Sequence, residues 1–315
     1  MSSVNCRICL EPLEDGASQY HHGCCRKLFG APHAPAMPYT LEQLNKIAEE
    51  IVRRNVTVPG VQPKISMHLE AEGARGKARL TLVGLEGGYI LKPPVERFPE
   101  MPELEHLTMR MAACFGISTV ECGLIPLGDG QLSFITKRMD RDGGMKLHME
   151  DMCQLTDRLT EQKYRGSMEQ VGKAILRHSS NPLFDALRFF EVTLFSFLTG
   201  NSDRHLKNYS LLYGAEGEIA LSPAYDLLPT VLLLPEDEEE MALTLNGRKR
   251  RLKRRDFSQL GASLKLTERQ VENTYARFSG GIDPATEMIT RGLCSQEMKD
   301  SFKVLLEERV KRVEL

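Results

Sequence analysis

Two kinds of hydrophobic pattern alternate along the first part of the chain. Short alternating stretches, bounded by glycines or prolines, predict strands at residues 65–69, 78–83, 89–92, 120–125 and 132–137. Helical spacing predicts one helix at residues 40–52, with Thr40 as N-cap and Gln43 three residues later. A second helix is expected at residues 103–115, before Gly116. We therefore expect a small mixed lobe over residues 36–140.

Beyond residue 140 the pattern is mainly helical. Residues 183–198 are strongly apolar with helical spacing, which predicts a buried central helix. Two short stretches, 209–213 and 219–221, predict a hairpin, and residues 256–315 predict further helices. A small mixed lobe followed by a larger, mainly helical lobe over residues 141–315 is typical of an α+β, two-lobed, protein-kinase-like fold.

Composition and charge exclude several classes of protein. The chain has 315 residues and a formal net charge of −2, so no overall field draws it to nucleic acid or to anionic lipid. No apolar run approaches the roughly 20 residues needed to span a bilayer. The N-terminus lacks the apolar core of a secretory signal. We therefore expect a cytoplasmic protein without a membrane partner.

Polar residues after the predicted buried helix indicate phosphoryl transfer. Asp203 and Asn208 lie five residues apart, and kinases use this spacing for a carboxylate that orients the attacking hydroxyl and an amide that binds Mg²⁺. Asp226, eighteen residues after Asn208, follows a short predicted strand and is suited to hold the metal that bridges the phosphates of ATP. The alternative is that Asp203 is a turn residue and Asp226 a helix cap.

A lysine and a glutamate upstream complete the order that a kinase requires. Lys92 ends a predicted strand, and Glu105 lies thirteen residues later on the following predicted helix. Kinases hold the α- and β-phosphates of ATP with such a pair. The alternative is that Lys92 is a solvated lysine at the end of a strand. The order of Lys, Glu, Asp, Asn and Asp along the chain favours the catalytic interpretation.

Five motifs then resemble those of the HipA family of toxin kinases. They are Val58–Lys64, Ile90–Pro93, Glu150–Gln154, Gly200–Asn208 and Leu221–Asp226. The resemblance covers roughly residues 40–260 and implies a serine/threonine kinase of a bacterial type II toxin–antitoxin system. Full-length members carry a β-rich domain ahead of the kinase core. This chain is more similar to the short, HipT-like type, in which that domain is a separate small protein.

The resemblance implies a role for each matching residue. The chemistry would fall to Asp203 as catalytic base, to Asn208 and Asp226 as Mg²⁺ ligands, and to His205 and Lys207 as cations beside the transferring phosphoryl group. Contacts with ATP would come from Lys92 with Glu105, from Val58, Gly60, Gln62 and Lys64 over the phosphates, and from Phe134, Lys137 and Met139 in the hinge that receives adenine.

The loop over the phosphates departs from the family pattern. Its family counterpart follows an autophosphorylated serine, and here that position is Thr57, which keeps a hydroxyl nucleophile. Phosphate on Thr57 would add negative charge beside the phosphate-binding loop and so oppose ATP binding. Some short members carry a second serine two residues earlier. Asn55 stands at that place, so a doubly phosphorylated loop is not expected.

The resemblance also implies partners. The protein substrate would be an aminoacyl-tRNA synthetase, and the chain would bind a helix-turn-helix antitoxin and a small HipA N-terminal-domain-like protein. A basic run over residues 248–255 would permit direct contact with DNA phosphates, but an acidic run over residues 236–240 lies nearby. We favour a neutralised, solvated hairpin, with DNA contacted only through the antitoxin.

Residues 1–35 form a separate Cys/His-rich module. The pairs Cys6–Cys9 (C-x2-C) and His21–Cys24 (H-x2-C) are separated by eleven residues, which predicts a structural Zn²⁺ site because each pair can clamp one edge of a tetrahedron. His22 and Cys25 are alternatives for the second pair. The other interpretation is a metal-free module that packs on the kinase lobe through Leu10, Leu13 and Phe29.

A non-catalytic function competes with the kinase. The chain would then be a zinc-bearing adaptor, a pseudokinase that binds a partner without transferring phosphate. Pseudokinases usually lose at least one catalytic residue, whereas this chain keeps the lysine, both aspartates and the asparagine. The sequence therefore favours the enzyme.

Overall fold

The computed structural model describes the chain except for residues 1–3, 15–17, 55–61, 71–77, 84–86 and 143–144. The chain divides into two compact units. The first unit consists of Met1–Arg110, Val120–Arg138 and Arg291–Ser295. The second unit consists of Met111–Thr119, Met139–Thr290 and Gln296–Leu315. No helix in the described part of the chain combines the length and the apolar composition needed to cross a bilayer.

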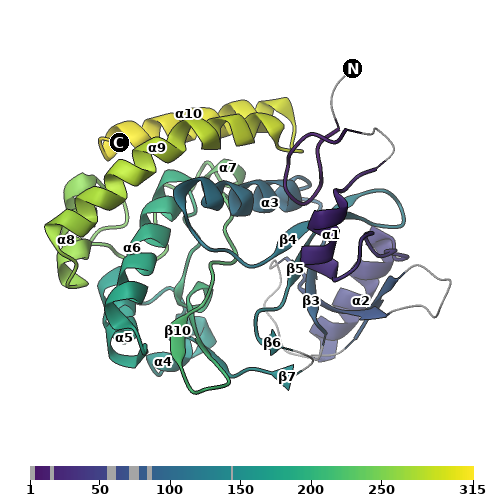
Figure 1. Ribbon diagram of the computed structural model, residues 1–315, viewed down its shortest axis with the longest axis horizontal. Coiled ribbons are helices and arrows are strands. Elements are labelled where there is room, and N and C mark those ends of the chain that lie inside the picture. The colour runs from purple at the N-terminus through teal and green to yellow at the C-terminus, as the bar shows by residue number, and fades with distance from the viewer. Residues whose placement is uncertain (1–3, 15–17, 55–61, 71–77, 84–86, 143–144) are drawn as a thin grey trace. The chain divides into compact units, whose positions relative to one another are not determined.

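A five-stranded antiparallel sheet forms the centre of the first unit (Figure 1). Its strands lie in the order β2-β1-β3-β5-β4. They are β1 (Ile65–Glu70), β2 (Arg79–Leu82), β3 (Tyr89–Lys92), β4 (Cys122–Pro126) and β5 (Leu132–Lys137). All five were predicted. Burial alternates at the start of β1, whereas β4 is buried over all but its last residue. The register pairs Lys92 at the end of β3 with Phe134 of β5.

The helices of the first unit are α1 (His22–Phe29), α2 (Leu41–Arg54) and α3 (Met101–Met111). The predicted cap of α2 is confirmed, because Gln43 N donates to Thr40 Oγ1 at 3.3 Å and Thr40 N donates to Gln43 Oε1 at 3.0 Å. The predicted helix at 103–115 tightens after α3 into the 3₁₀ turn η1 (Ala112–Phe115). It ends as expected at Gly116, whose φ of 71° lies in the left-handed region.

The Cys/His-rich module, called the head below and defined as residues 4–35, is packed on the sheet. Ile8, Leu28 and Phe29 belong to the same buried hydrophobic cluster as Leu91 of β3 and Ile135 of β5. Figure 1 shows α1 beside these strands. The packing is close at Gly123 of β4, where an added Cβ would lie 2.8 Å from a side-chain carbon of Ile8. The head is therefore part of the core of this unit.

The second unit is mainly helical. Its helices are α4 (Met152–Leu155), α5 (Met168–His178), α6 (Pro182–Leu198), α7 (Thr230–Leu233), α8 (Arg254–Ser263), α9 (Glu268–Arg291) and α10 (Gln296–Arg312), with 3₁₀ turns η2 (Thr160–Gln162) and η3 (Leu206–Asn208). The predicted central helix is α6, which is almost entirely buried beyond its first turn. The strands are β6 (Arg141–Asp142), β7 (Met145–Lys146), β8 (Met149–Asp151), β9 (Ser210–Tyr213) and β10 (Ile219–Leu221).

The hairpin β9–β10 was predicted, and β8 was not. In the structure β8 pairs with β9, which gives a three-stranded sheet in the order β10-β9-β8. Three residues of Met, Glu and Asp carry no β-pattern of their own. They form a strand only because their backbone pairs with that of β9.

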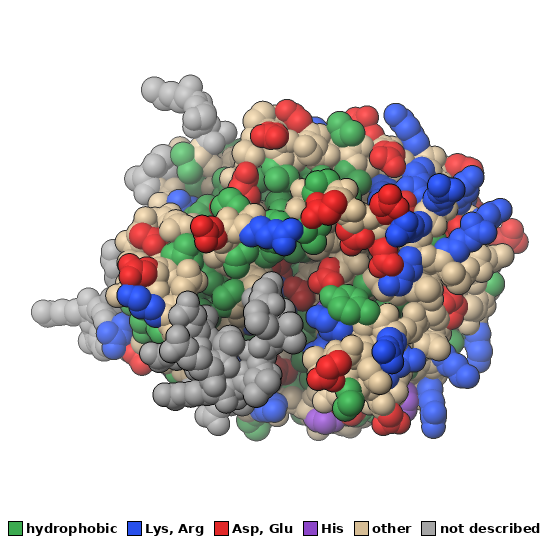
Figure 2. Space-filling model, turned by 180° about the vertical axis from the view of Figure 1, so that it is seen from behind, with side chains coloured by type: hydrophobic (Ala, Val, Ile, Leu, Met, Phe, Trp, Pro, Cys, Tyr) green, Lys and Arg blue, Asp and Glu red, His purple; other side chains and the backbone are tan. Residues whose placement is uncertain are grey.

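The charge runs at residues 236–240 and 248–255 pair with each other. Lys249 Nζ lies 3.0 Å from Glu239 Oε2, and Arg250 contacts Glu238. On the face shown in Figure 2, Lys and Arg side chains are interspersed with Asp and Glu side chains. This arrangement supports the neutralised hairpin over a phosphate-binding surface.

Candidate functional site

The first unit contains a buried ion pair between β3 and α3. Lys92 Nζ lies 2.5 Å from Glu105 Oε1, and the two side chains are 6% and 1% exposed. The ammonium also lies over the ring of Phe134, 5.5 Å from its centre. The interpretation of Lys92 as a solvated lysine is therefore wrong. A buried cation oriented by a carboxylate and an aromatic ring is suited to bind a polyanion.

The segment that the sequence assigns to the ATP phosphates is described only in part. Thr57, Val58 and Gly60 lie outside the described residues. Gln62 is half-buried, and its Nε2 donates to the Pro93 carbonyl at 2.9 Å, which places it directly after the strand that ends in Lys92. Lys64 is exposed at the start of β1.

The proposed hinge residues lie in β5 and directly after it. Phe134 is buried beneath the Lys92 ammonium, whereas Lys137 is exposed at the end of β5. The chain passes from the first unit to the second between Arg138 and Met139. Met139 is half-buried.

In the second unit, the loop after α6 carries the predicted base. The loop begins at Gly200, whose φ of 70° and contact with Leu305 leave no space for a Cβ. Asp203 is exposed, and its Oδ1 accepts a hydrogen bond from the hydroxyl of Tyr164 at 2.6 Å. Burial and then the neighbouring carboxylate raise the pKa of Tyr164, so its hydroxyl stays a donor. The Tyr164 ring stands edge-on to His205, with 5.2 Å between ring centres.

Asn208 is oriented by the same loop. Its Nδ2 donates to the Asp203 carbonyl at 3.3 Å, and its side chain is buried. This bond orients the amide group and leaves the amide oxygen available as an acceptor. The spacing between the two residues corresponds to the 3₁₀ turn η3, which brings the end of the loop back toward its start.

Arg204 joins this loop to the segment of the second predicted metal ligand. Its guanidinium donates to the Tyr225 carbonyl and to the Asn208 carbonyl, both at 2.9 Å. It also lies 4.4 Å from the ring centre of Tyr209. The side chain is only 2% exposed. Sequence reasoning passed over Arg204, although a cation between a catalytic Asp and Asn was a visible signal.

Asp226 has a strained backbone. Its φ of 57° lies in the left-handed region, which is uncommon for a residue with a side chain. Asn201 Nδ2 donates to its carbonyl at 3.3 Å, so the strained residue is held from the loop that also carries Asp203. Tyr225, directly before it, donates through its hydroxyl to the Lys207 carbonyl at 2.8 Å. The structure thus brings the segments of Asp203, Asn208 and Asp226 together.

Lys207 has a carboxylate partner that was not predicted. Its Nζ lies 2.7 Å from Asp151 Oδ2, and Asp151 Oδ1 accepts from the backbone N–H of Gln154. Asp151 therefore caps α4 and holds Lys207 at the same time. The D-x-x-Q spacing at 151–154 was the signal that could have revealed this residue.

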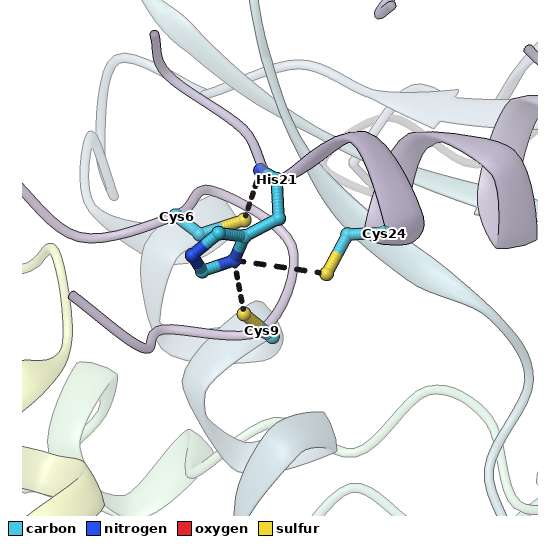
Figure 3. Close-up of side chains that lie close together, drawn as sticks. All are labelled: Cys6, Cys9, His21 and Cys24. Atoms are coloured by element: carbon cyan, nitrogen blue, oxygen red, sulfur yellow. Dashed lines mark hydrogen bonds between the residues drawn. The ribbon is translucent and has the colours of Figure 1, made fainter. Parts of the chain in front are cut away.

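The four predicted metal ligands of the head converge (Figure 3). The three sulfurs and the imidazole ligand atom of Cys6, Cys9, His21 and Cys24 all lie within 4.8 Å of one another. His21 Nδ1 is 3.3 Å from Cys9 Sγ and 4.0 Å from Cys24 Sγ. Its Nε2 lies 3.2 Å from the Pro12 carbonyl, and since a carbonyl only accepts, Nε2 carries the proton and Nδ1 is the bare nitrogen that can bind a metal.

The structure also decides between the alternatives for the second pair. Cys25 is 1% exposed and belongs to the hydrophobic core, and the His22 ring packs against His33. Neither joins the four-residue cluster. Within that cluster, the hydrogen bond from Cys9 lowers the pKa of Cys6 to about 4 and raises the pKa of Cys9. The cluster therefore favours one thiolate even without a metal.

Comparisons with known proteins identify relatives of this chain. Residues 56–285 match the family model described as the HipA-like C-terminal domain. A protein of Haemophilus influenzae named putative kinase is 29% identical over 238 residues, 71% of this chain and 67% of that protein. Putative kinase Y4dM of Sinorhizobium fredii is 32% identical over 69% of this chain and 56% of its own length. The serine/threonine-protein kinase toxin HipA of Shewanella oneidensis is 26% identical over 68% of this chain and 56% of its own length. The chain thus spans little more than half the length of the last two.

Two solved structures share the fold. HipA in the complex of Shewanella oneidensis HipA, HipB and operator DNA superposes with a TM-score of 0.67 at 19% identity, covering 85% of this chain and 71% of HipA. The Helicobacter pylori proinflammatory kinase CtkA gives a TM-score of 0.55 at 16% identity, covering 78% of this chain and 93% of CtkA. The expected α+β, kinase-like fold is confirmed.

Proposed function

The chain belongs to the HipA-like C-terminal domain family, and from this premise we propose that it is an ATP-dependent protein serine/threonine kinase. The observation that carries the proposal is the attachment of the Asp203–Asn208 loop to the backbone of Tyr225 and Asp226 through Arg204 and Asn201. Phosphoryl transfer is mainly a matter of positioning and electrostatic stabilisation, so a site of this kind must hold its carboxylates rigidly.

Asp203 is the base in this proposal. It accepts the proton of a serine or threonine hydroxyl as that oxygen bonds to the γ-phosphorus of ATP, while the bond from phosphorus to the β,γ-bridging oxygen breaks and ADP leaves. The hydrogen bond that Asp203 accepts from Tyr164 is the same type of contact. Lys207, held by Asp151, and His205 provide nearby donors for the transferring phosphoryl group.

Asn208 and Asp226 fit a magnesium ion by their chemistry, because an amide oxygen and a carboxylate are the hard oxygen ligands that Mg²⁺ prefers. The ion would neutralise charge on the phosphates. Lys92, fixed by Glu105, would bind the α- and β-phosphates of ATP. The proposed hinge of Phe134, Lys137 and Met139 would receive adenine, and the Val58–Lys64 loop would cover the phosphates.

The same family membership supports a role in a toxin–antitoxin pair. The Shewanella HipA structure contains HipB and operator DNA. We propose a corresponding helix-turn-helix antitoxin as partner of this chain, with DNA contacted through that partner, and a small HipA N-terminal-domain-like protein as a second partner. The proposed substrate is an aminoacyl-tRNA synthetase.

The head is proposed to hold one structural Zn²⁺. Three thiols and a bare imidazole nitrogen within 4.8 Å of one another match a Cys₃His site in ligand type and number. The Pro12 carbonyl provides the outer contact that orients a metal-binding histidine. Leu10 and Phe29 are also buried and Leu13 packs against the hydrophobic cluster, so in this proposal packing and the metal act together.

Replacement of the base tests the catalytic proposal. Asp203→Asn keeps an oxygen that can accept from Tyr164 but removes the basic carboxylate, so we expect phosphate transfer from Mg-ATP to fall about 100-fold or more. Radiolabelled phosphate transfer measures it. Asp300→Asn is the matched control, because Asp300 is an exposed aspartate on α10 that also accepts an amide hydrogen bond.

Equal labelling by wild type and Asp203→Asn would refute the kinase proposal with Asp203 as base. Absence of labelling with wild type would favour the non-catalytic adaptor function. Phosphoproteomes of cells that express the two proteins identify the substrate. We expect a synthetase peptide that is labelled only with wild type.

Removal of the Tyr164 hydroxyl tests whether this hydroxyl competes with the substrate hydroxyl for Asp203. Tyr164→Phe keeps the ring contact with His205 but removes the donor to Asp203, so kcat/KM for the protein substrate should rise about threefold to tenfold, the worth of one hydrogen bond. Steady-state kinetics measure the change. Tyr213→Phe is the control, because Tyr213 donates to the carboxylate of Glu150 in the same way. A fall in kcat/KM would instead assign Tyr164 to the catalytic apparatus.

Autophosphorylation is tested at Thr57. Wild-type protein incubated with Mg-ATP should gain the mass of one phosphate group, and Thr57→Ala should gain none. Thr57→Ser restores a hydroxyl and should gain the phosphate again. Intact-mass spectrometry decides, and equal mass gains in wild type and Thr57→Ala would exclude this site.

Metal content tests the head. Elemental analysis should find one zinc per chain in wild type and in Cys25→Ala, and none or much less in Cys24→Ala, because only Cys24 of these neighbours belongs to the cluster. Thermal stability should fall with the zinc, since binding energy in such sites contributes to folding. Wild-type protein without zinc after expression in zinc-supplemented medium would contradict the assignment.

A further inference from the structure

Two backbone carbonyls of the head point from the proposed metal site to the sheet and to α3. Both belong to the residues between Cys6 and Cys9. The Arg7 carbonyl accepts from Leu124 N of β4 at 2.8 Å, and the Ile8 carbonyl accepts from His106 Nε2 of α3 at 2.9 Å. The four-residue turn is closed by a hydrogen bond from Leu10 N to the Cys6 carbonyl. The positions of Cys6 and Cys9, the two proposed ligands at the ends of this turn, therefore set the position of both carbonyls.

The His106 side chain is shielded from water. A water molecule therefore cannot replace the Ile8 carbonyl as its hydrogen-bond acceptor. The side chain is 1% exposed, and burial lowers its pKa to about 4, so it is neutral. Because the Ile8 carbonyl can only accept, the proton lies on Nε2. A buried donor that loses its acceptor is costly. The helix thus keeps its orientation as long as the Ile8 carbonyl stays in place.

His106 is directly next to Glu105 along α3. Successive residues of a helix point about 100° apart, so one turn of α3 directs one side chain to the head and the next to Lys92 of β3. The head is also bonded to the sheet, because Tyr20 donates to the Leu124 carbonyl and Tyr89 donates to the Leu28 carbonyl, both at 2.9 Å. All of these groups belong to the first unit.

We propose that metal binding by Cys6, Cys9, His21 and Cys24 fixes the Ile8 carbonyl, which through His106 positions α3 so that Glu105 holds Lys92. His106 is a positioning residue, and the head makes the nucleotide-binding lysine dependent on zinc. Its effect on catalysis rests on the proposed kinase function, whereas the coupling between metal, His106 and α3 rests only on the proposed metal site of the head. Without the metal, the turn at Cys6–Cys9 is held only by weaker contacts, such as the bond from Leu10 N to the Cys6 carbonyl and the contact of His21 with Cys9.

Variants of His106 test the coupling with the metal ligands intact. His106→Phe keeps a flat aromatic ring, somewhat larger than imidazole, and removes the donor. We expect one zinc per chain, about tenfold faster hydrogen exchange of the α3 amides and about tenfold weaker binding of magnesium with a non-hydrolysable ATP analogue. His106→Gln places an amide N–H at similar reach and should restore most of both properties. Thr108→Val is the control, because Thr108 is buried on the same helix and bonds only to the Leu104 carbonyl within it.

The metal arm uses Cys9→Ala, alone and with His106→Phe. Zinc-free Cys9→Ala should show the same faster exchange in α3, and the double variant should be no faster than either single variant, because both act on one link. Wild-type exchange of α3 in zinc-loaded His106→Phe, or additive effects in the double variant, would overturn the proposal. If the wild type binds no nucleotide, the kinase proposal fails while the exchange data still decide the coupling. If Cys9→Ala does not fold, the His106 series decides alone.

Discussion

Lys92 and Glu105 place two opposite charges in the interior of the first unit, where neither has much access to water. Removal of one partner from such a pair typically costs about 3–5 kcal/mol, because the remaining charge stays buried and unpaired. The strand and the helix that carry the pair must therefore keep a fixed relation. The contact between the Ile8 carbonyl and His106 holds the helix one residue away from Glu105. The pair thus explains why the head belongs to the core of this unit.

In the second unit a buried cation again holds two segments together, and here the cation is Arg204. Arg204 is a buried cation whose charge is compensated by two backbone carbonyls and the ring of Tyr209. A guanidinium offers five donors in a rigid plane, so it can join two backbone segments at once. One segment carries Asp203 and Asn208, and the other carries Asp226 in its strained conformation. In both units, a buried cation holds the functional segments in position.

Local patterns predicted most elements of the fold. The five strands of the first sheet, α2 with its cap, and α6 all follow from periodicity and end signals. The order of Lys92, Glu105, Asp203, Asn208 and Asp226 along the chain was also visible in the sequence, and their roles in catalysis are proposals. Most of the misses share one cause. The strand β8, the contact of Lys207 with Asp151 and the contact of Tyr164 with Asp203 depend on neighbours distant in sequence.

The head shows most clearly what the sequence determined and what only the tertiary structure decided. The sequence by itself determined that two Cys/His pairs lie eleven residues apart and suit zinc. It left His21 against His22 and Cys24 against Cys25 open, because each choice satisfies the same spacing. Only the tertiary structure decided, since adjacent residues at the start of α1 point in different directions and the core takes Cys25. It alone also revealed that the turn between Cys6 and Cys9 contacts α3, because the two segments are about a hundred residues apart and no local pattern records their contact.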